Sequence, residues 1–178
     1  MNEYIDSLLN TIPGSVYVVL ICAAVVYSLF IIGIKGVNES FKQTSIGLLF
    51  IYAIFIICTT VVYRPVIGYE IRLIPFGSYF NLYDGCERAY EENLMNVIAF
   101  VPIGLLLTVG TKKQNWKRVG IVGLCLSFVI EFLQFHYKRG IGEIDDLIHN
   151  TIGCVIGYFA AKSICSLYKG INQRNHCG

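Results

Sequence analysis

The chain has 178 residues, of which 55% are hydrophobic and 15% are charged. Soluble domains carry about 25% charged residues, so this composition excludes an ordinary soluble protein and indicates a membrane protein. The formal net charge of +2 is too weak a bias to suggest a nucleic-acid partner.

Five stretches are long and apolar enough to cross a bilayer as helices, because a hydrocarbon core of about 30 Å takes roughly 20 helical residues. Many of these residues are β-branched, but an isolated strand would leave its backbone groups unpaired in lipid, so helices are expected. In chain order the predicted transmembrane helices cover about 15–34, 44–63, 94–111, 119–137 and 147–168. We therefore expect an all-α integral membrane protein, with residues 1–178 forming a single membrane domain and one bundle of about five transmembrane helices.

Basic residues in the connections predict the orientation of this bundle. Connections on one side carry nine Lys and Arg residues and those on the other side carry five. Because cytoplasmic connections are richer in Lys and Arg, the N-terminus is expected outside and the C-terminus inside. A multi-pass membrane protein follows from this interpretation.

The long connection between the second and third predicted helices holds a segment near 69–80 that includes Pro75. This segment is too short and too mixed to cross the membrane. Its apolar and aromatic residues favour a place in the interface, or a path that dips into the membrane and returns.

Several polar residues fall within the predicted helices, where an ionisable group costs roughly 2.5–3.5 kcal/mol at the centre and by default suggests function. Glu131 and Gln134 share a face of the fourth helix, and Asp146, Asn150, Gly153 and Gly157 form one stripe of the fifth. The start of the third helix, the end of the fourth and the start of the fifth lie in one leaflet, whichever side is outside. The predicted polar face comprises Arg72, Asn96, Glu131, Gln134, Arg139, Asp145, Asp146 and Asn150.

Each of these polar residues also has a structural interpretation. Glu131 can hydrogen-bond a neighbouring helix, Asp145 and Asp146 suit a helix N-terminus, and Asn150 can join two helices. Together, Arg72 and Arg139 with the three acids would form a charge network that either fixes the helices or binds a zwitterionic or anionic group.

Other residues are expected to shape the bundle. The motif from Gly153 to Gly157 favours close helix packing, and Pro102 removes a backbone donor and invites a kink. The residues with expected structural roles are Pro75, Pro102, Gly104, Gly153 and Gly157. His136 and His149 are interpreted first as hydrogen-bonded groups at the interface. The seven cysteines show no Cys-x-x-Cys pair and no accompanying His at ligand spacing, so no metal site is expected. No cofactor is expected either.

Three blocks of the sequence resemble the VanZ-like family of bacterial membrane proteins. They are the Arg-Leu-Ile-Pro-Phe element at 72–76, the Asn-Val-Ile-Ala-Phe-Val-Pro-Ile-Gly run at 96–104, and Glu131-x-x-Gln134 followed by Asp145-Asp146-x-x-x-Asn150-x-x-Gly153. The resembling core lies at about 69–168. One departure is Glu143, where relatives often carry an Asp that is one methylene shorter.

This resemblance implies a phenotype rather than a reaction, because the family is named after a protein associated with teicoplanin resistance. We expect a membrane protein that lowers susceptibility to teicoplanin-type lipoglycopeptides by altering the cell envelope through an outward polar face. Its partners would be the lipid bilayer and an outer-leaflet lipid or cell-wall precursor. The sequence indicates no oligomeric state.

Two alternatives stay open. An integral-membrane enzyme could act on a lipid-linked or headgroup substrate with Glu131 or Asp146 as its acid or base, although no nucleophile or metal set accompanies them. A small transporter or channel is the second alternative. Against it, the sequence shows no inverted repeat, and its polar residues stop at one leaflet.

Overall fold

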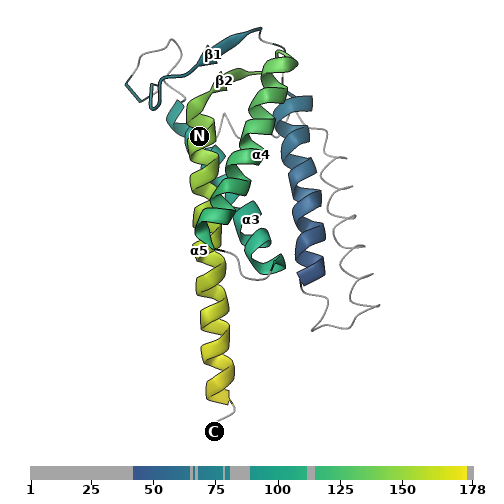
Figure 1. The fold of residues 1–178 in the computed structure, drawn as a ribbon, viewed down its shortest axis with the longest axis vertical. Coiled ribbons are helices and arrows are strands. Elements are labelled where there is room, and N and C mark those ends of the chain that lie inside the picture. The colour runs from purple at the N-terminus through teal and green to yellow at the C-terminus, as the bar shows by residue number, and fades with distance from the viewer. Residues whose placement is uncertain are drawn as a thin grey trace.

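A computed structural model describes residues 42–64, 66, 68–77, 79–80, 89–111 and 115–175. The first predicted helix, 15–34, and the position of the N-terminus lie outside these residues. Within them the protein is mostly helical (Figure 1). The helices are Lys42–Val62, α3 (Ala89–Gly110), α4 (Trp116–His136) and α5 (Ile144–Asn175), and the strands are β1 (Glu70–Arg72) and β2 (Ile141–Glu143).

Three of the described helices are long and apolar enough to span a membrane: Lys42–Val62, Tyr90–Gly110 and Trp116–His136. They overlap the second, third and fourth predicted helices. The fifth prediction, 147–168, falls inside α5, which is 32 residues long. Its lower half projects past the ends of the other helices (Figure 1). A total of about five membrane crossings therefore stays a prediction.

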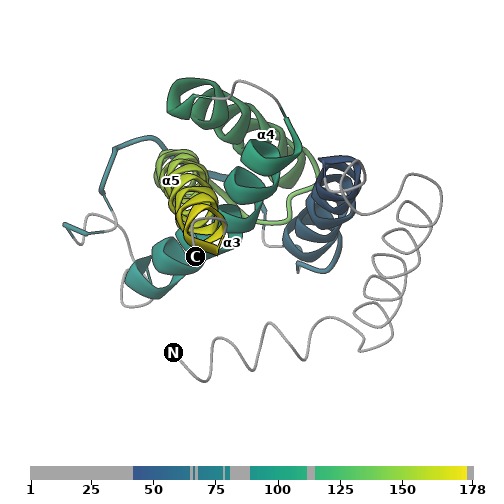
Figure 2. The ribbon, with the colours of Figure 1, turned by 90° about the horizontal axis from the view of Figure 1, so that it is seen from below.

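Local sequence explains where these helices begin and join. The side chain of Asn115 caps α4 by accepting a hydrogen bond of 2.8 Å from the Arg118 backbone N–H. The Lys42–Val62 helix ends in a π-helical turn from Cys58, and the Tyr52 hydroxyl ties this helix to α3 by donating to the Ala99 carbonyl at 2.9 Å. Seen from below, α3, α4 and α5 form a group and the Lys42–Val62 helix lies at its edge (Figure 2).

The buried core of this bundle is small, as suits a protein surrounded by lipid. Its buried residues include Phe100 and Ile103 of α3, Val119 and Ile130 of α4, and Cys154 of α5. Many large apolar side chains point outward instead, and they include Phe50, Ile54, Ile121, Phe128, Phe132 and Phe159. Lipid tails can solvate such surfaces, so their exposure fits a membrane protein.

Glycines bring α3 and α5 into backbone contact. A Cβ on Gly157 would collide with the Val101 carbonyl and lie 2.8 Å from the backbone nitrogen of Leu105, and one on Gly153 would lie 2.9 Å from the Phe100 Cβ. From the α3 side, a Cβ on Gly104 would lie 2.8 Å from the Cα of Cys154. These glycines therefore set the distance between the two helices.

The expectation of an all-α protein is incomplete, because β1 and β2 pair as a two-stranded parallel ladder. Glu70 lies opposite Ile141, Ile71 opposite Gly142, and Arg72 opposite Glu143. The ladder closes the end of the bundle where α4 ends and α5 begins (Figure 1). Part of the 69–80 segment is thus a strand attached to the helices. Strands of three residues carry no readable periodicity, so the sequence alone could not indicate them.

Candidate functional site

Two carboxyl groups meet between α4 and α5. Glu131, near the end of α4, is buried, and its side chain hydrogen-bonds to that of Asp146 in the first turn of α5. A hydrogen bond between two carboxyl groups requires that one of them carries the proton. The remaining acceptors are also used: the Glu143 backbone N–H donates to Glu131 Oε2 at 3.2 Å, and Asn96 Nδ2 of α3 donates to Asp146 Oδ1 at 2.6 Å.

A polar stripe continues from this pair along the contact between α4 and α5. Asn150 Nδ2 donates to Ser127 Oγ at 2.9 Å, and both residues are buried. One turn beyond Glu131, Gln134 Nε2 donates to the Thr60 carbonyl at 3.0 Å, which joins the stripe to the Lys42–Val62 helix. The side-chain oxygens of Gln134 and Asn150 are buried and accept no hydrogen bond from any residue that the structure describes. Such unsatisfied buried acceptors are costly, and they indicate a place for a further donor.

The two arginines of the predicted charge network bond to groups other than the Glu131 and Asp146 side chains. Arg72 pairs with Glu70 at 2.8 Å and with Glu143, across the ladder, at 3.1 Å. Arg139 Nη1 donates to the backbone carbonyls of Val62 and Arg64. The arginines thus fasten the connections at this end of the bundle, an arrangement that side-chain types alone did not indicate.

Glu143, the residue that departs from the resembling pattern, lies between Arg72 and the carboxyl pair. Its backbone holds Glu131 while its side chain holds Arg72, so it links the ladder to α4. The pKa of Glu143 is raised to about 7, mainly by burial and then by the negative charge of Asp146, while the Arg72 guanidinium lowers it. The carboxyl group therefore changes its charge near neutral pH.

The turn after β1 is anchored on the first turns of α5. The Phe76 backbone N–H donates to Asp145 Oδ1 at 2.6 Å, and Phe76 follows Pro75 with a φ of 60°, a conformation that disfavours a bulky side chain. His149 Nδ1 lies 2.6 Å from the Asp145 carbonyl, so this nitrogen carries the proton and Nε2 accepts the Tyr79 hydroxyl at 2.9 Å. Asp145 and His149 thus hold the turn in place.

Arg64 is the site residue that sequence reasoning missed. Its guanidinium acts electrostatically on Glu131 and Asp146 and approaches Gly140, where a Cβ would lie 3.1 Å from Nη1. Gly140 has a φ of 155°, which a residue with a side chain rarely adopts. The available signal was a basic residue placed just after a predicted transmembrane helix.

The arrangement can exchange a proton, accept hydrogen bonds and attract an anion. Within the described part of the chain, no three His, Cys, Asp or Glu side chains are grouped as a metal site would require. The Ser127 hydroxyl lies 3.5 Å from the Asp146 carbonyl and accepts from Asn150, so it serves the stripe between the helices.

Comparison with known proteins relates most of this chain to one family. Residues 15–166 match the family model described as VanZ/LLP1. A curated relative, Protein VanZ of Enterococcus faecium, is 33% identical over 105 residues, which are 59% of this chain and 58% of that protein. The chain thus matches little more than half the length of this relative. No solved structure matches the chain.

Proposed function

Because the chain belongs to the VanZ/LLP1 family, we propose that it lowers bacterial susceptibility to teicoplanin-type lipoglycopeptides from within the cell membrane. We propose several membrane crossings. The outer face would hold the ladder of β1 and β2 and a polar cluster formed by Asn96, Glu131 and Asp146. Teicoplanin-type drugs carry a fatty acyl tail that partitions into the outer leaflet near the cell-wall precursor. A protein acting at that depth can alter the envelope so that the drug binds its target less well.

One observation carries the proposal: polar groups from three helices converge at a single end of the bundle. There, Asn96 of α3 and Glu131 of α4 both interact with Asp146 of α5. A carboxyl group within a membrane helix is energetically costly, so its presence suggests a function.

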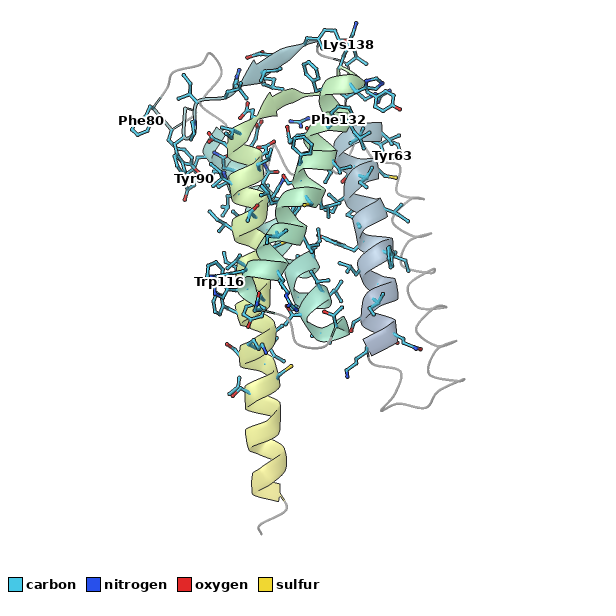
Figure 3. The ribbon with its side chains drawn as sticks, viewed as in Figure 1. Tyr63, Phe80, Tyr90, Trp116, Phe132 and Lys138 are labelled. Carbon is cyan, nitrogen blue, oxygen red and sulfur yellow. The ribbon has the colours of Figure 1, made fainter. Side chains whose placement is uncertain are left out.

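The segment beside this cluster supports a place at the membrane surface. Large apolar side chains along it are exposed: Val66, Tyr69, Ile71, Leu73, Ile74 and Phe80. Lys138 lies over the Tyr69 ring, 4.6 Å from its centroid. Figure 3 shows Phe80 and Lys138 toward the ladder end and Trp116 nearer the other end of α4. Aromatic rings beside a lysine are typical of the headgroup region, so we assign residues 69–80 to the outer interface.

The proposal is tested by the inhibitory concentration of teicoplanin, with vancomycin in parallel, in a susceptible host. The host expresses the wild type, Glu131→Gln, Asp146→Asn, or the control Lys117→Gln, whose side chain is exposed at the start of α4. Membrane levels are matched by immunoblot. We expect a selective rise for teicoplanin that the control keeps and either isostere abolishes. No rise with the wild type would refute the function, and a rise that both isosteres keep would refute the role of the carboxyl pair.

A second candidate function is favoured by the contact between Glu131 and Asp146. Two carboxyl groups that share a proton can serve as acid and base toward a lipid-linked or headgroup substrate. Lipid and precursor profiles of the Glu131→Gln strain separate the two functions. An altered profile together with a lost phenotype would favour chemistry, whereas an unchanged profile with a lost phenotype would refute it.

A further inference from the structure

The guanidinium of Arg64 lies beside the carboxyl pair without a bonding partner of its own. Within the described chain its side chain makes no hydrogen bond and no ion pair, although it is half-buried and acts on Glu131 and Asp146 electrostatically. A guanidinium offers five N–H donors in a planar fork, which suits the oxygens of a carboxylate or phosphate. Leaving these donors unused in a partly desolvated place is unfavourable unless a ligand takes them.

An unused acceptor lies next to these unused donors. Among the described residues the Oε1 atom of Gln134 has no hydrogen-bond partner, and Gln134 is 2% exposed. Its amide orientation is fixed, because Nε2 donates to the Thr60 carbonyl. A Cβ on Gly140 would lie 3.4 Å from this oxygen and 3.1 Å from Arg64 Nη1, so both groups face the bare Cα of Gly140. An atom placed at that position would therefore lie within 3.4 Å of both.

We infer that Arg64 and Gln134 form a subsite for a phospholipid headgroup that carries a phosphate together with a hydroxyl or ammonium donor. The phosphate oxygens accept from the guanidinium, and the donor supplies Gln134 Oε1. A phosphate without such a donor satisfies only half of the subsite. The carboxyl pair nearby keeps a purely anionic ligand less favourable than one that also carries a donor.

The position of the subsite favours a lipid over a free ion. Arg64 lies two residues after the end of the Lys42–Val62 helix, and Tyr63 and Lys138 lie at that end of the bundle in Figure 3. The exposed rings of Tyr69 and Tyr137 flank the same connection. This inference rests on the proposed function in one respect only, which is that the lipid comes from the outer leaflet.

Binding can be measured by calorimetry on the purified full chain in a non-ionic detergent. The probes are dihexanoyl-phosphatidylglycerol, which carries a phosphate and hydroxyl donors, dihexanoyl-phosphatidylcholine, which carries the phosphate without donors, and inorganic phosphate. The proteins are the wild type, Arg64→Gln, Arg64→Lys and the matched control Lys138→Gln. Lys138 is an exposed cation at the same end of the bundle, so it tests diffuse attraction to an anionic lipid.

We expect the glycerol lipid to bind the wild type, and Arg64→Gln to raise its Kd about tenfold or more, because charge-assisted hydrogen bonds are lost. Lys138→Gln should change the Kd less than about threefold, since an exposed charge contributes little. The choline lipid should bind several-fold more weakly than the glycerol lipid. If Arg64→Gln does not fold, Arg64→Lys decides, because it keeps the charge and loses the fork; unchanged affinity would overturn the inference.

Three results would overturn it in different ways. Equal losses in the Lys138 and Arg64 variants would mean diffuse electrostatic adsorption. Equal affinities for the glycerol and choline lipids would show that Gln134 does not take part in binding. Equally tight binding of inorganic phosphate would show that the subsite does not select a lipid. No antibiotic enters this measurement, so the susceptibility assay can fail while lipid binding stands, and lipid binding can fail while the susceptibility phenotype stands.

Discussion

Replacing Gly157 by Ala tests whether backbone contact between α3 and α5 holds the bundle together. The new Cβ would collide with the Val101 carbonyl and lie 2.8 Å from the Leu105 nitrogen, whereas ordinary contact begins near 3.4 Å. The helices would have to move apart by more than half an ångström at this crossing. A hydrogen bond of 2.6 Å from Asn96 Nδ2 to Asp146 Oδ1 joins the same two helices. Moving the helices apart would therefore also strain this bond.

The expected loss of stability follows from two opposing effects. Overpacking that shifts the backbone costs about 1–3 kcal/mol, and a collision with main-chain atoms belongs near the upper end. Alanine regains about 1 kcal/mol over glycine in helix propensity, so the net loss is about 2 kcal/mol. Gly120 of α4 is the matched control, because its Cβ would meet Val155 Cγ2 at an ordinary 3.4 Å. Gly120→Ala should therefore be neutral or stabilising by up to about 1 kcal/mol.

Equilibrium unfolding of the purified protein in mixed detergent micelles measures both variants against the wild type. The two alanine variants should differ in their free energy of unfolding by about 2–3 kcal/mol. A Gly157→Ala protein as stable as Gly120→Ala would refute the idea that the backbones touch here. Retention of wild-type lipid binding by a destabilised Gly157→Ala protein would show that the packing and the ligand subsite are independent.

Three other expectations concern the ends of the bundle. The pKa of Glu143 is raised to about 7, so the folded state holds the proton more tightly than the unfolded state. The unfolding temperature should therefore rise as the pH falls from 8 to 5. Glu143→Gln should flatten this dependence on pH. A profile as steep in the variant as in the wild type would contradict that cause. Tyr79→Phe removes the hydroxyl that bonds His149 and should speed proteolysis in the 69–80 turn severalfold while costing about 1 kcal/mol; unchanged proteolysis would mean that Asp145 alone anchors the turn. Cys86 belongs to the long connection between the second and third predicted helices and lies outside the described residues. With the other cysteines replaced, it should react with a membrane-impermeant maleimide in intact cells, and protection until lysis would reverse the predicted orientation.

Uncharged runs allowed the helices to be predicted, because the boundaries of a membrane span are set by charge. The segments 44–63, 94–111 and 119–137 each overlap a helix that is apolar enough to span. Alternating crossings would bring the start of the third predicted helix, the end of the fourth and the start of the fifth into one leaflet whichever side of the membrane is outside. The structure does bring Asn96, Glu131 and Asp146 together at such an end.

The partners of the arginines could not be predicted in the same way. Arg72 meets Glu143 only because β1 and β2 pair in one register, and a register between three-residue strands depends on the packed helices. Arg139 uses main-chain carbonyls, which every sequence offers. Arg64 became visible only as an unbonded group in three dimensions, since a lone arginine after a span ordinarily faces the headgroups.

The parallel ladder also dictates an order of events during synthesis. Arg72 and Glu143 are 71 residues apart, so at about 5–20 residues per second Arg72 leaves the ribosome roughly 4–14 s before its ladder partner. Both α3 and α4 are translated in that interval, and Asp146 follows its α3 partner Asn96 by 50 residues. The polar end is therefore the last part of the bundle to close. A chain that ends before Glu143 can form neither the ladder nor the bond between Asn96 and Asp146, so the polar end depends on the start of α5.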